Sequence, residues 1–169
     1  MSLLDLPPTS GATFSNDGAY RYALWRHWGD EGDPIAVFLM LNPSTAGPII
    51  DDPTIRRCLG FARTWGLGGL HVVNLFALRS TDPIALLQHP DPVGPDNDRH
   101  VVDGVTPHAG VVVAAWGALT RPLHDRRDAV LSLLADRGVS LRCLGKTKRT
   151  GEPRHPLFVP RDTVLEDYP

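Results

Sequence analysis

Amide side chains stand where two apolar segments of this sequence end. Asn42 follows an apolar run over residues 35–41, and Asn74 interrupts another run over residues 70–76. An amide offers a donor and an acceptor together, which suits reading the edge of a nucleobase or orienting an attacking water. Asn42 is therefore a candidate catalytic residue and Asn74 a candidate substrate-binding residue. A turn that closes the strand is the alternative explanation for Asn42.

The same segments carry further candidates for contacts with a substrate. Pro43 and Ser44 continue the turn after Asn42, and Phe76 ends the second run. Trp116 and Gly117 follow a third run, where an indole can stack on a planar ligand and a glycine lets the backbone approach closely. We count all five as candidate substrate-binding residues, with core filling as the alternative role of the tryptophan.

Positive charge is concentrated after the fourth apolar run, over residues 145–156. Lys146 and Arg154 are candidate phosphate-binding residues because flexible cationic side chains suit phosphate. Arg154 and His155 lie between two prolines, which hold their backbone in a narrow range of directions. The segment is no P-loop: Ser140 occupies the position of the required earlier glycine, and prolines follow where a helix must begin.

Four carboxylates lie near these strand ends. Asp52 and Asp98 are explained as helix caps, which leaves Asp51 and Asp96 freer to act as a general base or to bind a metal weakly. We take Asp51 as a further candidate catalytic residue. Two isolated carboxylates do not define a metal site, so we expect neither a bound metal nor another cofactor.

The apolar pattern predicts a single α/β domain over residues 1–169, with residues 1–18 poorly ordered. Strands are expected near residues 20–25, 35–41, 70–76, 111–115 and 140–144, the first two as a hairpin. Helices are expected from Asp52 to Trp65, over residues 84–88, after Asp98 and over residues 123–137. Arg56 and Arg57 lie on the polar face of the first of these helices and are candidate phosphate-binding residues. Residues from 145 onward are expected to be loop.

Strands that alternate with helices imply right-handed crossovers and a mainly parallel sheet. We therefore predict a three-layer αβα fold with a short sheet and one antiparallel N-terminal strand at its edge. Ligands bind beyond the carboxyl ends of the strands in such sheets, where the candidate residues are located.

Composition is that of an ordinary globular protein, with 42% hydrophobic and 21% charged residues in 169 and a net charge of -2. This balance argues against an overall cationic nucleic-acid binder but leaves room for a local basic patch. Cys58 and Cys143 occur in apolar stretches and are predicted to be buried thiols. Because no signal-like start or membrane-length apolar run occurs, we expect a cytoplasmic protein without a membrane partner. The sequence indicates no obligate protein partner.

The motifs together resemble the bacterial and phage family called domain of unknown function 1643. The resemblance covers nearly the whole chain. It rests on the segments that start at Met40, Asp51, Val73, Asp96, Ala115 and Pro153.

More distantly, the arrangement is similar to the uracil-DNA glycosylase superfamily, which has an Asn-Pro turn after its first core strand and a late His-Pro. The resemblance implies that Asn42 places the hydrolytic water, Asn74 reads a flipped base and His155 stabilises the departing base anion. Leu41 stands where that superfamily has a glycine, and Leu157 follows the His-Pro where it has a serine-containing wedge loop.

Three functions remain open at this point. The first is a glycosylase-like hydrolase acting on a nucleobase or nucleotide, with Arg56, Arg57, Lys146 and Arg154 on phosphate. The second is a non-catalytic module that binds a nucleotide or nucleic acid through the same strand ends. The third is a phosphoester hydrolase that uses Asp51 and Asp96 around a divalent ion.

Overall fold

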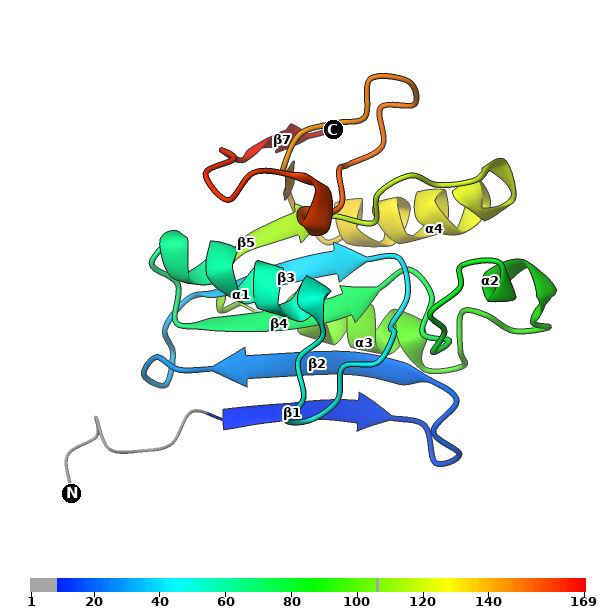
Figure 1. The fold of residues 1–169 in the computed structure, drawn as a ribbon, viewed down its shortest axis with the longest axis horizontal. Helices are drawn as coiled ribbons and strands as arrows, with labels where there is room; N and C mark the ends of the chain where they lie inside the picture. The colour runs from blue at the N-terminus through cyan, green and yellow to red at the C-terminus, as the bar shows by residue number, and fades with distance from the viewer. Residues whose placement is uncertain (1–8, 106) are drawn as a thin grey trace.

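The computed structural model describes residues 9–105 and 107–169, which form an α/β fold around a seven-stranded mixed sheet (Figure 1). The strand order is β1-β2-β4-β3-β5-β6-β7. The strands are β1 (Thr9–Phe14), β2 (Arg21–His27), β3 (Ile35–Met40), β4 (Gly69–Asn74), β5 (Ala109–Ala114), β6 (Leu141–Cys143) and β7 (Glu166–Tyr168). The helices are α1 (Pro53–Thr64), α2 (Ala85–Gln88), α3 (Asn97–Gly104) and α4 (His124–Ala135), with short 3₁₀ helices η2 (Arg121–Leu123) and η3 (Pro156–Phe158).

Four neighbouring strands, β4, β3, β5 and β6, are parallel and form the centre of the sheet. Helices cover both faces: Figure 1 shows α1 in front of the sheet and α3 and α4 behind it. Helix α1 begins as predicted, because the Asp52 carboxylate accepts a hydrogen bond from the Ile55 N–H and Pro53 occupies the first turn. The parallel strands therefore end together at one edge of the sheet, between the two helical layers.

The outer strands differ from the prediction. Strand β2 does not form a hairpin with β3; it pairs antiparallel with β1 and with β4. Strand β1 forms the edge of the sheet, although poor order was expected for residues 1–18. Residues 1–8 of that range lie outside the described part of the chain. Strand β7 pairs antiparallel with β6 at the opposite edge, in a tail expected to be loop. The sheet is thus larger and more mixed than expected.

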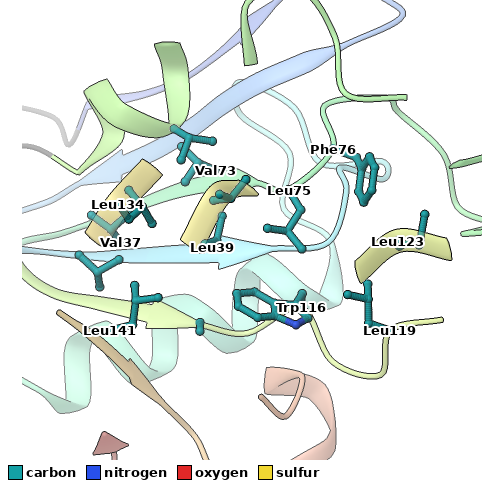
Figure 2. Packing of buried hydrophobic residues seen from close by; sticks show 14 of the residues in the cluster. Val37, Leu39, Val73, Leu75, Phe76, Trp116, Leu119, Leu123, Leu134 and Leu141 are labelled. Atoms are coloured by element: carbon teal, nitrogen blue, oxygen red, sulfur yellow. The ribbon is translucent and has the colours of Figure 1, made fainter. Parts of the chain in front are cut away.

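Each face of the sheet has its own hydrophobic core. Val37, Leu39 and Leu75 pack with residues of α3 and α4 on one face, as Figure 2 shows. Phe38 and Phe61 belong to the core under α1 on the other face. Both cysteines are buried and unpaired, as predicted. No helix of the described residues has the length and apolar character that crossing a membrane requires.

Acidification is expected to destabilise this fold through His71 on β4. Burial lowers the pKa of His71 to about 4, and its buried Nε2 has no hydrogen-bond partner among the described residues. The unfolded chain, with a histidine pKa near its ordinary value of 6.5, takes up the proton first. Stability is therefore lost as the pH falls from about 6.5 toward 4. Between pH 7 and pH 5 this costs roughly 2 kcal/mol.

Urea unfolding of the wild type and of His71→Leu at the two pH values measures this effect. The loss of stability between pH 7 and pH 5 is expected to be roughly 2 kcal/mol smaller in the variant. An unchanged difference between pH 7 and pH 5 in the variant would rule out His71 as the source.

Candidate functional site

A cavity of about 540 Å³ lies at the carboxyl ends of β3, β4 and β5. The loop after β3 leads to α1 on one face of the sheet, whereas the loop after β4 leads to α3 on the other. Ligands bind at such a divergence of loops in open α/β sheets. The first turn of α1, the loop over residues 80–83 and the tail around η3 complete its walls.

Asn74 lines this cavity from the end of β4. Its side chain is 1% exposed, and neither Nδ2 nor Oδ1 has a hydrogen-bond partner among the described residues. Its main-chain oxygen is held separately, by the Nδ2 of Asn97 at 2.9 Å. A buried amide without partners costs free energy, and such a group in a folded protein calls for an explanation. Asn74 therefore has an unused donor and an unused acceptor buried beside the cavity.

His155 lines the same cavity from the tail, and its protonation is fixed by its surroundings. Burial lowers the pKa of His155, although the charge of Asp52 opposes the shift. The ring Nδ1 accepts a hydrogen bond from the Leu157 N–H at 3.2 Å. The neutral ring therefore carries its proton on Nε2 and acts as a donor there.

Gly117 fixes the position of the tail beside the end of β5. Its N–H donates to the Pro153 oxygen at 3.0 Å, and its φ is +77°. A Cβ at this position would stand 3.2 Å from the Cβ of His155. Glycine is therefore required both by the backbone conformation and by the approach of His155.

Asp52 and Arg21 add opposite charges to the cavity wall. One oxygen of Asp52 caps α1 through the Ile55 N–H at 2.8 Å, and the other has no described hydrogen bond. Arg21 is 3% exposed, and its Nη1 donates to the Ala46 oxygen at 2.8 Å. Burial lowers the pKa of Arg21 to about 10, with nearby Asp52 opposing the shift. Arg21 is thus still charged at neutral pH.

Asn42 lines the cavity, but its amide nitrogen also holds the surrounding loops together. The Nδ2 donates to the main-chain oxygens of Pro43, Leu78 and Ser80 at 3.1, 3.3 and 3.0 Å. Only Oδ1 is free of a described hydrogen bond. The structure therefore gives Asn42 the turn-closing contacts that the sequence left as an alternative, and places it at the cavity as well.

The other predicted substrate-binding residues separate into two groups. Ser44 and Gly117 line the cavity, whereas Pro43 is buried in the turn and Phe76 is 3% exposed in the core. Trp116 contributes to the lining, but its indole is buried in the core together with Leu119, as Figure 2 shows. Stacking of the indole face on a ligand is therefore not available in this arrangement.

Asp51 and Asp96 do not line the cavity. The Asp51 carboxylate forms an ion pair with the Nη2 of Arg26 at 3.0 Å, which holds the loop before α1. Asp96 stands at the N-cap of α3, 3.8 Å from the Nη2 of Arg99. No three His, Cys, Asp or Glu side chains gather to suit a metal ion within the described residues.

The predicted phosphate-binding residues lie in three places. Arg154 lines the cavity and donates to the Phe158 oxygen at 3.0 Å. Lys146 lies outside the lining, 3.9 Å from the Oε1 of Glu166. Arg56 and Arg57 line a second groove, between α1 and the segment that contains η3. The structure therefore brings only one of the four to the cavity.

Sequence reasoning missed Glu152, which is 2% exposed behind the cavity wall. Its Oε2 accepts a hydrogen bond from the Trp116 Nε1 at 2.7 Å, and its Oε1 accepts one from Arg127. The only signal in the sequence is an acidic residue inside a basic loop. It also missed Arg21, which looks like one polar position in an aromatic strand.

Comparison of the sequence with known protein families shows one relationship. A family model described as "Protein of unknown function (DUF1643)" matches residues 21–157. No curated protein and no solved structure gives a significant match. Because the matched segment covers well over half of the chain, the protein belongs to the DUF1643 family.

Proposed function

We propose that this protein hydrolyses the N-glycosidic bond of a nucleotide unit whose base is bound in the cavity at the carboxyl ends of β3, β4 and β5. The observation that carries the proposal is the unpaired amide of Asn74. Leaving a buried polar group without a partner costs roughly 1–3 kcal/mol. A ligand edge with an adjacent acceptor and donor recovers that cost, and nucleobases have such edges.

Asp52 and His155 supply the chemistry on two sides of the bound unit. The free oxygen of Asp52 orients a water and accepts its proton as the water oxygen bonds to the sugar C1′. The bond from C1′ to the base nitrogen breaks, and its electron pair leaves with the base. The Nε2–H of neutral His155 then donates a hydrogen bond to the base anion.

We further propose that the fold is related to the uracil-DNA glycosylase superfamily. The support is the placement of Asn74 at the end of β4 and of His155 before Pro156 in one cavity. The water-binding role passes from Asn42 to Asp52 in this proposal, because the Asn42 nitrogen already binds three main-chain oxygens.

The three hydrogen bonds of the Asn42 amide nitrogen also favour a second candidate function, that of a module that binds a nucleotide without cleaving it. In that case the contacts of Asn74 and His155 serve recognition alone. A metal-dependent phosphoester hydrolase built on Asp51 and Asp96 is not proposed, because neither carboxylate lines the cavity.

Incubation with single- and double-stranded DNA carrying damaged or modified bases, in the presence of a chelator, separates the two candidates. Hot alkali then cleaves the strand wherever a base has been lost. His155→Ala and Asp52→Asn are each expected to lower the cleavage rate by roughly 10²- to 10³-fold. Asparagine still caps α1, so the melting temperature of Asp52→Asn should change little.

His89→Ala is the control, because His89 lies outside the cavity lining. Base loss that persists in both cavity variants would refute the assigned roles. Binding of DNA without any base loss in the wild type would select the non-catalytic module.

A further inference from the structure

A second groove of about 490 Å³ lies between α1 and the segment that contains η3. Three arginines line it, Arg56 and Arg57 from α1 and Arg161 from the segment after η3, and no acidic side chain is among the lining residues. None of the three forms an ion pair with any described residue. We call this surface the arginine groove. Its cationic groups therefore lack the carboxylate partners that five other arginines of the described chain have, namely Arg26, Arg99, Arg126, Arg127 and Arg142.

The arginine groove and the cavity share a wall. Pro53 lines the groove and Thr54 the cavity, both in the first turn of α1. In the same way, Leu157 of η3 lines the groove and Phe158 lines the cavity. A ligand that extends from the cavity over this wall therefore enters the groove.

The length of the groove suits a chain of phosphates better than a single one. Its lining extends along α1 from Pro53 to Thr64. At a rise of about 1.5 Å per residue, this stretch is about 16 Å long. Arginine is well suited to phosphate oxygens because its planar guanidinium donates two parallel hydrogen bonds.

An exposed aromatic side chain stands at the shared wall. Phe158 is 74% exposed, although an aromatic ring of this size is usually buried. Aromatic rings beside basic grooves stack on the bases of single-stranded nucleic acids. The ring of His155 lies 5.6 Å from that of Phe158, so a base stacked on Phe158 would neighbour the cavity.

From these observations we infer that the arginine groove binds the phosphodiester backbone of a single-stranded nucleic acid, one nucleotide of which occupies the cavity. The inference rests on the proposed function for the occupant of the cavity. It makes a polynucleotide, and not a free nucleotide, the substrate. Because the whole chain has a net charge of -2, the positive charge of the arginine groove is a local feature of the surface.

Fluorescence anisotropy with labelled single-stranded DNA and RNA oligonucleotides tests the inference, with a labelled mononucleotide in a parallel arm. Arg57→Ala/Arg161→Ala is expected to weaken oligonucleotide binding by roughly tenfold or more at moderate salt. The slope of log affinity against log salt concentration should become shallower by about 1.4, which is about 0.7 for each lost phosphate contact. Mononucleotide binding should not change, because neither arginine lines the cavity.

Arg99→Ala/Arg137→Ala is the matched control, since it removes the same charge from α3 and from the end of α4 on the opposite face. Circular dichroism melting shows whether each variant is folded, and Arg57→Gln/Arg161→Gln replaces the alanine variant if it is not. Equal oligonucleotide affinity and salt slope in the groove variant and the control would overturn the inference. So would an equal loss of mononucleotide binding in the groove variant.

The two proposals fail in different ways. Groove-dependent oligonucleotide binding without any base release would contradict the hydrolase and leave the groove assignment standing. Base release from a mononucleotide at the rate seen with an oligonucleotide would contradict the groove and leave the hydrolase standing. The DNA and RNA arms identify which sugar the bound strand carries.

Discussion

Asn74→Leu is expected to make the protein more stable and to abolish binding of the base. Leucine has a similar size and lacks the polar atoms that are buried without partners on β4. The free energy of unfolding should therefore rise by roughly 1–3 kcal/mol. Base binding and base release should both be lost, because the amide supplies the recognition. Urea unfolding and ligand titration measure the two effects on the same sample.

Asn97→Leu is the control, because Asn97 is the same residue type and is 0% exposed. Its Nδ2 donates to the main-chain oxygens of Asn74 and Leu75 at 2.9 and 3.1 Å, and only its Oδ1 has no partner among the described residues. Removing these bonds should lower stability by roughly 2–3 kcal/mol. If Asn74→Leu lowers stability as Asn97→Leu does, the Asn74 amide has a structural partner and is not reserved for a ligand.

Glu152→Ala is expected to cause the second large effect, a loss of roughly 3 kcal/mol of stability. The change leaves the Trp116 indole nitrogen without its acceptor and removes one of the two carboxylates that bind the Arg127 guanidinium. Glu152 lies three residues before His155, so the tail that carries His155 loses the anchor that the Glu152 side chain provides. Activity should fall together with stability. Chemical unfolding of the purified variant checks the magnitude.

Glu152→Gln separates the hydrogen bond from the charge at this position. Glutamine keeps an oxygen for the Trp116 indole but no longer neutralises Arg127. Its loss of stability should be about half that of the alanine variant. A Glu152→Ala protein as stable as the wild type would contradict the anchoring role.

The central strands could be predicted because β3 and β5 are continuous apolar runs, as expected for strands buried on both faces. The edge strands could not. Strand β7 consists of Glu166, Asp167 and Tyr168, mostly exposed, and only its pairing with β6 makes it a strand. The β2–β3 hairpin was a wrong prediction from a turn-like segment, because which strand pairs with which depends on contacts far apart in sequence.

The candidate site was predictable where the residue itself stands at the carboxyl end of a strand, as Asn74 does. It was not predictable where neighbours in sequence point in different directions. Asp51 and Asp52 are adjacent, yet Asp51 pairs with Arg26 while Asp52 lines the cavity. Capping of α1 and lining of the cavity are compatible, because a carboxylate has two oxygens. Arg21 joins the cavity only through the long-range pairing of β2.

The side-chain amide resonances of Asn74 provide the most direct test of the central claim that this residue reads a nucleobase. Comparing ¹⁵N–¹H spectra of the wild type and Asn74→Leu assigns them by their loss. The protein is then titrated with a panel of nucleosides and short single-stranded oligonucleotides. We predict that at least one ligand shifts both Asn74 amide protons downfield as the amide gains partners. Saturating binding that leaves these resonances unmoved, or an absence of binding by every ligand, would contradict the account.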